Sequence, residues 1–302
     1  MKVISVRDLE LYMRCPRAYK FKVINDAISQ EKPLSLCKSI TTKRVIFWMH
    51  ENKFKLTKDD IGQQCSLIWD EELSDPRVNQ QELQEVVIAE KLATKKTKGK
   101  PSISKREKLL ESITVWCLNY HKIEKDTNVL HFNIPYECQI GDARFTGAID
   151  LVRQNDDNTI EIVKLRTSSQ APALAFIERD ISLTLASYAS WKGNFFINDQ
   201  GSDLQISIAQ IPRAFYYHLP FLETYKRNAK NGKKGEVKGN PLIESSRSQE
   251  KLLDFEFEIL QVVAGIEMNY FPMRIIQPCG CCLCAFRHQC ESFVDSPTKV
   301  ML

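Results

Sequence analysis

The sequence has no apolar run long enough to span a bilayer, no internal repeat and no long low-complexity tract. Its opening residues, MKVISVRDLELYMRC, do not have the layout of a secretion signal. We therefore expect a cytoplasmic protein with no membrane partner. Hydrophobic residues make up 43% and charged residues 26% of the 302 residues, which is an ordinary globular composition with enough chain for a sizeable core.

The net charge of +4 is modest, but the positive charge is unevenly distributed. Two segments, 91–108 and 226–238, are strongly basic, and further cations flank the N-terminal Cys15. Such segments favour a polyanion partner, although each could instead be a solvated loop. The candidate nucleic-acid-binding residues are Arg17, Lys20, Lys95, Lys96, Lys98, Lys100, Arg106, Lys226, Arg227, Lys230, Lys233 and Lys234.

Local sequence signals predict alternating helices and strands. Ser5 is a good N-cap, and Asp8 occupies the capping-box position three residues later. Because Pro16 disfavours a helical Cys15, we expect two short helices that meet at a corner there. Other predicted helices cover 45–53, 80–92, 103–122, 178–191 and 248–269, and predicted strands cover 129–140, 145–153, 159–167, 204–210 and 214–218. This order predicts a mixed α/β (α+β) fold with a central sheet.

Ten cysteines without a secretion signal indicate thiols or metal ligands rather than disulfides. Cys37, Cys65, Cys117 and Cys138 are scattered among apolar residues and are best explained as core thiols. Near the C-terminus, Cys281, Cys284 and Cys290 have the spacing C-x2-C-x5-C, which can bring three thiolates to one metal centre. Cys15 is the candidate fourth ligand. Zinc, no metal, and a pairing of Cys279 with Cys282 remain alternatives.

The predicted hairpin over 145–167 carries a second candidate site. Asp150 lies on its first strand, and Lys164 and Arg166 lie two apart on its second strand. Residues two apart on a strand point to the same face. An acid aimed across a hairpin at two cations is the geometry of a functional site.

These motifs together resemble a known family. The segment Ser5–Lys22, with its YxxCPRxYxF core, and the closing C-x2-C-x5-C motif resemble RecB-like PD-(D/E)XK nucleases of the iron–sulfur type, a group that includes AddB and the CRISPR-associated iron–sulfur exonucleases. His50, Asp150 and Tyr188 are similar to that family's helix histidine, strand acid and helix tyrosine. The resemblance implies a restriction-endonuclease-like fold, and a [4Fe–4S] cluster on Cys15, Cys281, Cys284 and Cys290.

The resemblance also implies one nuclease-fold domain over residues 1–302. We expect an N-terminal cluster-cysteine segment (1–37), a helical insertion (38–125), a sheet core (126–225), a basic loop (226–247), and a C-terminal helix with the cluster segment (248–302).

The chain departs from the family pattern at three positions. Lys164 replaces the second metal-binding acid, Arg166 replaces the catalytic lysine, and Thr184 replaces the glutamine. Exchanging a carboxylate for an ammonium changes the local charge by two units, each worth roughly 4 kcal/mol at about 4 Å and an effective dielectric of 20. We therefore expect no catalytic Mg²⁺ or Mn²⁺. We predict that Lys164 pairs with Asp150 and fills the space of a metal.

The sequence therefore predicts a nuclease-fold DNA-binding subunit that has lost cleavage. Its partners would be DNA, as a single strand or a duplex end, and a helicase or other DNA-processing subunit. One alternative is an active Mg²⁺- or Mn²⁺-dependent exonuclease with a rearranged site around His50 and Asp150. Another is a structural subunit without a nucleic-acid role.

Overall fold

A computed structural model describes most of the chain. The described residues are 2–26, 32–78, 104–155, 157–168, 173–199, 202–206, 209–222, 241–245, 247–272, 286 and 290. The elements are β1 (Lys2–Ser5), α1 (Val6–Arg14), α2 (Pro16–Tyr19), the π-helix η1 (Lys20–Ile24), α3 (Leu34–Glu51), α4 (Lys58–Leu73), α6 (Lys105–Glu124), β2 (Val129–Ile140), β3 (Ala143–Gln154), β4 (Ile160–Arg166), α7 (Leu174–Glu178), α8 (Ile181–Lys192), β5 (Asn194–Asp199), β6 (Ser202–Ile206), β7 (Arg213–His218), β8 (Leu242–Ser245) and α10 (Gln249–Glu267). Within these ranges, no helix is long and apolar enough to cross a membrane.

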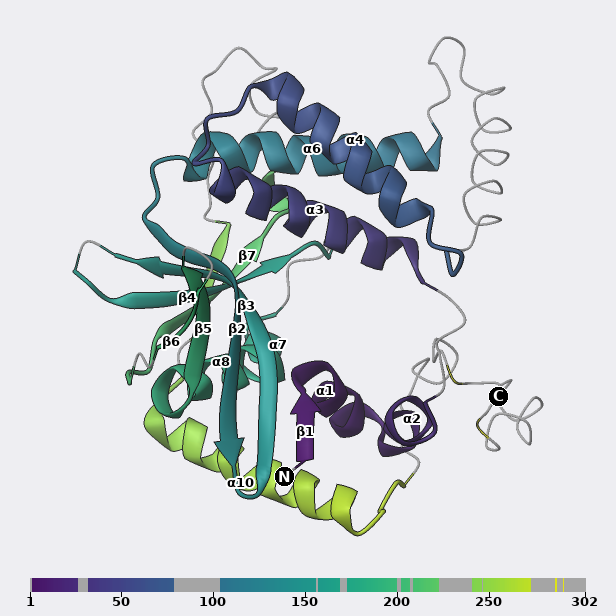
Figure 1. The fold of residues 1–302 in the computed structure, drawn as a ribbon, viewed down its shortest axis with the longest axis vertical. Helices are drawn as coiled ribbons and strands as arrows, with labels where there is room; N and C mark the ends of the chain where they lie inside the picture. Colours follow the sequence, from purple (N-terminus) through teal and green to yellow (C-terminus); the bar gives the residue numbers. More distant parts are fainter. Residues whose placement is uncertain are drawn as a thin grey trace.

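The strands form one eight-stranded mixed sheet (Figure 1). Seven strands follow the order β6-β5-β2-β3-β4-β7-β8, and β1 adds to β3. The pairs β1–β3 and β4–β7 are parallel, and the other neighbours are antiparallel. The predicted mixed α/β class with a central sheet is confirmed.

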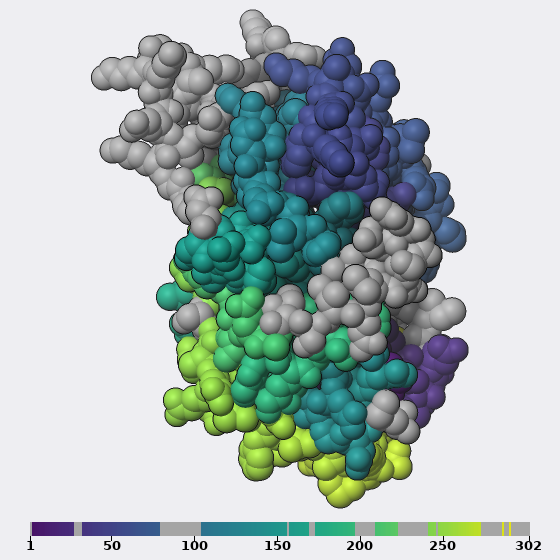
Figure 2. Space-filling model, turned by 60° about the vertical axis from the view of Figure 1, so that its left-hand side comes forward, coloured from purple at the N-terminus to yellow at the C-terminus, as the bar shows by residue number. Residues whose placement is uncertain are grey.

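Helices cover both faces of the sheet and create two cores. Helices α3, α4 and α6 pack on one face, and α1, α8 and α10 pack on the other (Figure 1). In the space-filling view, α3 and α4 (blue) and α10 (yellow) lie at opposite ends of the molecule, with strand residues between them (Figure 2). Strand β4 contributes to both cores because its side chains alternate between the two faces of the sheet. Ile160 and Ile162 lie in one core, and Val163 and Leu165 lie in the other.

The N-terminal corner forms as its sequence predicts. Ser5 caps α1, with its hydroxyl accepting the Asp8 N–H at 3.2 Å. Cys15 is extended, with φ −155°, and Pro16 begins α2. The chain therefore turns sharply at Cys15, which is half-buried.

Other expectations differ from the structure in detail. The helix expected over 178–191 corresponds to α8, which starts at Ile181 because Asp180 caps it by accepting the Leu183 N–H at 2.7 Å. Strands β1, β5 and β8 and helix α7 were not predicted. The helix expected over 80–92 and the basic segment 226–238 lie outside the described residues, as does most of segment 91–108.

Candidate functional site

Asp150 lies where β3 and β4 separate. Their ladder pairs Leu151 with Val163, and beyond that pair the Asp150 carboxylate accepts the Leu165 N–H at 2.8 Å. Lys43 of α3 donates to both carboxylate oxygens at 2.7 Å. The Asp150 side chain is 13% exposed. Its carboxylate is therefore enclosed and already neutralised by an ammonium from the facing helix.

Lys164 does not pair with Asp150, so that prediction is wrong. Its ammonium lies 3.0 Å from each carboxylate oxygen of Asp180, at the start of α8. Lys43, 107 residues before Asp150 in the sequence, holds the position predicted for Lys164. The prediction failed because the partner of Asp150 depends on how α3 is rotated against the sheet, which places Lys43 beside Asp150 and His50 beside Tyr120.

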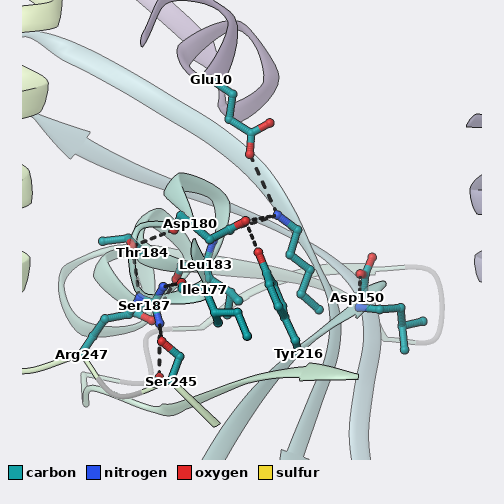
Figure 3. Close-up of polar contacts among 12 residues, drawn as sticks. Glu10, Asp150, Ile177, Asp180, Leu183, Thr184, Ser187, Tyr216, Ser245 and Arg247 are labelled. Carbon is teal, nitrogen blue, oxygen red and sulfur yellow. Dashed lines mark hydrogen bonds and ion pairs between the residues drawn. The ribbon is translucent and has the colours of Figure 1, made fainter. Parts of the chain in front are cut away.

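Asp180 anchors a small polar network (Figure 3). Its carboxylate accepts hydrogen bonds from Lys164, from the Leu183 N–H and from the hydroxyl of Tyr216. Burial opposes ionisation of Asp180, but Lys164 and these hydrogen bonds outweigh it and lower its pKa. Glu10 of α1 reaches toward the same ammonium, with 4.0 Å between its Oε1 and the Lys164 Nζ. Partial burial raises the pKa of Glu10 despite the nearby cation.

This network lines a groove of about 1100 Å³ that is rich in positive charge. Its walls come from α1, β4, α7 and the residues that precede α8. The acidic side chains are Glu10, Asp26 and Asp180, and the basic ones are Arg7, Arg14, Lys22, Arg77, Lys164, Arg166 and Arg179. The excess of cations gives the groove the electrostatics of a polyanion-binding site.

Four arginines of the groove, Arg7, Arg14, Arg166 and Arg179, form no ion pair with any described residue. Arg166 is held between two rings, with its guanidinium carbon 5.1 Å from the Tyr216 centroid and 5.8 Å from that of Phe176. Its Nε is buried and has no hydrogen-bond partner among the described residues. Sequence reasoning placed only Arg166 of these four at a site. The others lie on elements whose mutual approach was not predicted.

His50 is not at Asp150. It lies seven residues from Lys43 along α3, roughly 10 Å at the helical rise. Its Nε2 is 2.9 Å from the Tyr120 hydroxyl, and its ring stacks on Phe132 at 5.7 Å. Burial, together with the charge of Arg153, lowers the pKa of His50 to about 4. His50 is therefore a neutral member of an aromatic cluster.

Thr184 and Tyr188 also point away from Asp150. The Tyr188 hydroxyl donates to Glu256 of α10 at 2.8 Å, and the Thr184 hydroxyl accepts from Arg247 at 3.1 Å. These residues are four apart on α8 and share one of its faces. A different face of α8, with Ser182, Leu183 and Ala186, borders the hollow beside Asp150. Of the six predicted site residues, only Asp150, Lys164 and Arg166 lie near this hollow or the adjoining groove.

The hollow does not suit a catalytic divalent cation. Among its described lining residues, Asp150 is the only carboxylate, and Lys43 and Lys164 are both cationic. A Mg²⁺ site needs one or two carboxylates free to coordinate, together with water and phosphate. Asp150 could offer its oxygens only if Lys43 moved away.

The described members of the predicted nucleic-acid-binding set lie on different elements of the fold. Arg17 and Lys20 lie on α2 and at the start of η1, and the Lys20 ammonium is 6.0 Å from the Phe271 ring centroid. Arg106 pairs with Asp70 at the surface. The candidates at 95, 96, 98, 100, 226, 227, 230, 233 and 234 lie outside the described residues.

Residues from the two ends of the chain meet beside Cys15. The Tyr12 hydroxyl donates to the Tyr270 carbonyl at 2.9 Å, and Tyr19 stacks on Phe271 at 6.1 Å. Phe286, which lies in sequence between Cys284 and Cys290, is 6.2 Å from Phe21 by ring centroids. This packing places Tyr270, Phe271 and Phe286 at the N-terminal corner.

The candidate cluster ligands are only partly described. Cys15 and Cys290 are half-buried thiols, whereas Cys281 and Cys284 lie outside the described residues, as do Cys279 and Cys282. Among the described residues, no group of three or more His, Cys, Asp or Glu side chains is placed to hold a metal. The other four cysteines, Cys37, Cys65, Cys117 and Cys138, are buried and free of disulfides, as predicted for core thiols.

A mixed sheet covered on both faces defines an α/β protein, and its acid where β3 and β4 separate lies beside a basic groove. The sequence model of the PD-(D/E)XK nuclease superfamily matches residues 3–291. The chain therefore belongs to that superfamily, and the expected restriction-endonuclease-like fold is confirmed. No curated protein matches the chain.

Proposed function

We propose that this protein binds DNA through its basic groove and does not cut it at Asp150. The observation that carries the proposal is the contact of Lys43 with both Asp150 oxygens at 2.7 Å. In a metal-dependent nuclease the corresponding acid would coordinate the ion that activates water. Here an ammonium neutralises that acid, and Lys164 stands where a second acid would be needed.

Electrostatics makes the exchange of Lys43 for a divalent ion unfavourable. The ion would have to displace an ammonium held by two short hydrogen bonds and would then face the charge of Lys164. Pairing with Asp180 offsets part of the Lys164 charge, so this repulsion is smaller than the roughly 8 kcal/mol expected between a divalent ion and an unpaired cation at about 4 Å and an effective dielectric of 20. One carboxylate and the surrounding water would have to offset that cost.

DNA binding rests on the arginines of the groove. Cations that form no ion pair with the described residues contribute favourably to the free energy of DNA binding when phosphates replace their water and counterions. With several phosphate contacts, the logarithm of the binding constant should fall with the logarithm of salt concentration, at a slope of about −3 or steeper.

The proposal also assigns the chain to the RecB-like iron–sulfur branch, with a [4Fe–4S] cluster on Cys15, Cys281, Cys284 and Cys290. The contact of Phe286 with Phe21 supports it, because Phe286 lies in sequence between Cys284 and Cys290 and packs against the corner that carries Cys15. The bound cluster would stabilise the fold by linking Cys15 to the C-terminal cysteines. Zinc is the alternative occupant. Counting iron and zinc in protein purified without oxygen, with Cys15→Ser as the comparison, distinguishes the two.

The protein would act as a subunit of a DNA-processing assembly, together with a helicase or a similar partner. The loss of its own cleavage site favours such a role, because binding alone is useful where another subunit performs the chemistry. Identification of the proteins that co-purify from the native host tests this part of the proposal.

Cleavage and binding are tested separately with end-labelled DNA. We expect no cleavage with Mg²⁺ or Mn²⁺, and salt-sensitive binding that weakens in Arg179→Gln. Lys125→Gln is the matched control, since Lys125 is 55% exposed and does not line the groove. Cleavage that disappears in Asp150→Asn would establish an active enzyme and overturn the proposal. Absence of binding at low salt would favour a structural subunit.

A further inference from the structure

The carboxylate of Glu10 lies in the groove although the described structure holds it only weakly. Its side chain is 41% exposed, and its contact with Lys164 is an ion pair at 4.0 Å (Figure 3). By contrast, Asp180 on the other side of the same ammonium is 8% exposed and receives several hydrogen bonds. A ligand could therefore displace the Glu10 carboxylate, whereas the Asp180 carboxylate is held in place.

Two of the cations that face Glu10 are held in place by contacts of their own. Asp180 anchors the Lys164 ammonium, which also lies 5.8 Å from the Tyr216 ring centroid. The same ring and Phe176 hold the Arg166 guanidinium. Arg7, an exposed residue three positions before Glu10 on α1, projects from the same side of that helix. Because Lys164 and Arg166 are already positioned, binding a ligand would cost little ordering of these two side chains.

The local charge fits a dianion. Lys164, Arg166 and Arg7 carry three positive charges near Glu10, and Asp180 removes one. Two positive charges then remain for Glu10 or its replacement. A phosphate monoester carries close to two negative charges at neutral pH, whereas a backbone phosphodiester carries one. The dianion would neutralise the site more completely than either the diester or Glu10.

We propose that Lys164, Arg166 and Arg7 form a phosphomonoester site, and that the Glu10 carboxylate occupies it until such a ligand displaces it. The inference rests on the proposed function, because it treats this groove as the nucleic-acid interface. The monoester could be the terminal phosphate of a strand or that of a free nucleotide. Both share the chemistry of a doubly charged, terminal phosphate group.

The central test compares oligonucleotides of one sequence that end in a phosphate or a hydroxyl, at the 5′ or the 3′ end, against the full chain. We expect one phosphorylated end to bind at least tenfold more tightly than its hydroxyl counterpart. Competition by a nucleoside monophosphate and by inorganic phosphate tests whether a free nucleotide, rather than a strand end, supplies the phosphate group. We expect Arg166→Gln to lose the preference for the phosphorylated end, which would show that the preference depends on this site. Thermal melting checks that the variant is folded.

Glu10→Gln is the sharpest variant because it removes a competing charge without removing a hydrogen bond given by the structure. We expect it to tighten binding of the phosphorylated end about three- to tenfold. Glu258→Gln, at an exposed acid on α10, should change nothing. The advantage of Glu10→Gln should shrink as the pH falls, because wild-type Glu10, which faces Lys164, Asp180, Arg166 and Arg7, then becomes protonated.

The outcomes separate this inference from the function on which it rests. Equal binding of phosphate and hydroxyl ends, with no effect of Glu10→Gln, overturns the monoester site and leaves DNA binding intact. Binding of nucleoside monophosphate without any oligonucleotide binding supports the site and overturns the DNA-binding function. Absence of binding to every probe overturns both.

Discussion

Breaking the contact between Lys43 and Asp150 should destabilise the fold measurably. The two side chains are 27% and 13% exposed, so the pair lies between a surface ion pair and a buried one. Surface pairs contribute about 0–1 kcal/mol, and removing one partner of a buried pair costs about 3–5 kcal/mol. For Lys43→Met we expect a loss of about 2–3 kcal/mol in the free energy of unfolding, because the Leu165 N–H is then the only donor that the described residues give to Asp150.

Thermal and denaturant unfolding of four proteins measures the effect. The wild type, Lys43→Met, Asp150→Asn and the double variant form a cycle, for which we expect a coupling energy of about 1–2 kcal/mol. Glu244→Gln is the control, because Glu244 pairs with Arg213 where both side chains are more than two-fifths exposed. If Lys43→Met costs no more than this control, the Asp150 carboxylate is not neutralised by Lys43. Binding of Mn²⁺ by the wild type but not by Asp150→Asn would refute the same reasoning.

Two further predictions concern buried polar groups. Because burial lowers the pKa of His50 from 6.5 to about 4, the unfolded state binds more protons between these values. Stability should therefore fall as the pH drops through this range, by about 3 kcal/mol at most, and His50→Gln should flatten that part of the unfolding profile. Arg247 is 5% exposed and donates to Thr184, Ser245 and the Ile177 carbonyl. Arg247→Lys should cost about 2–3 kcal/mol in denaturant unfolding, since one ammonium cannot reach all three acceptors; an unchanged midpoint would contradict this.

The fold was predictable where local chemistry decides it. The Ser5 cap and the break at Pro16 depend on neighbouring residues, and the structure has both. The alternation along β4 likewise follows from the strand period and separates Ile162 from Val163 correctly.

The site was harder to predict because its partners come from distant elements. Lys43 reaches Asp150 from the same helix in which sequence reasoning singled out His50, and Lys164 pairs with Asp180 at the N-cap of α8. His50 matched a motif by its type and its place in a helix, but a shift of two helical turns takes it into an aromatic cluster. A motif fixes residue type and order, whereas contacts depend on helix rotation and strand separation.

The meeting of the chain ends has a consequence for biosynthesis. Tyr12 and Tyr270 are 258 residues apart, so at ribosomal rates the N-terminal corner waits roughly 10–50 s for its final neighbours. During that time Tyr12, Tyr19 and Leu9, which are buried in the finished protein, lack the side chains from α10 and Phe271 that help to cover them. Nascent chains should therefore engage chaperones through this corner. Any cofactor shared by Cys15 and Cys290 could be completed only once residue 290 has been synthesised.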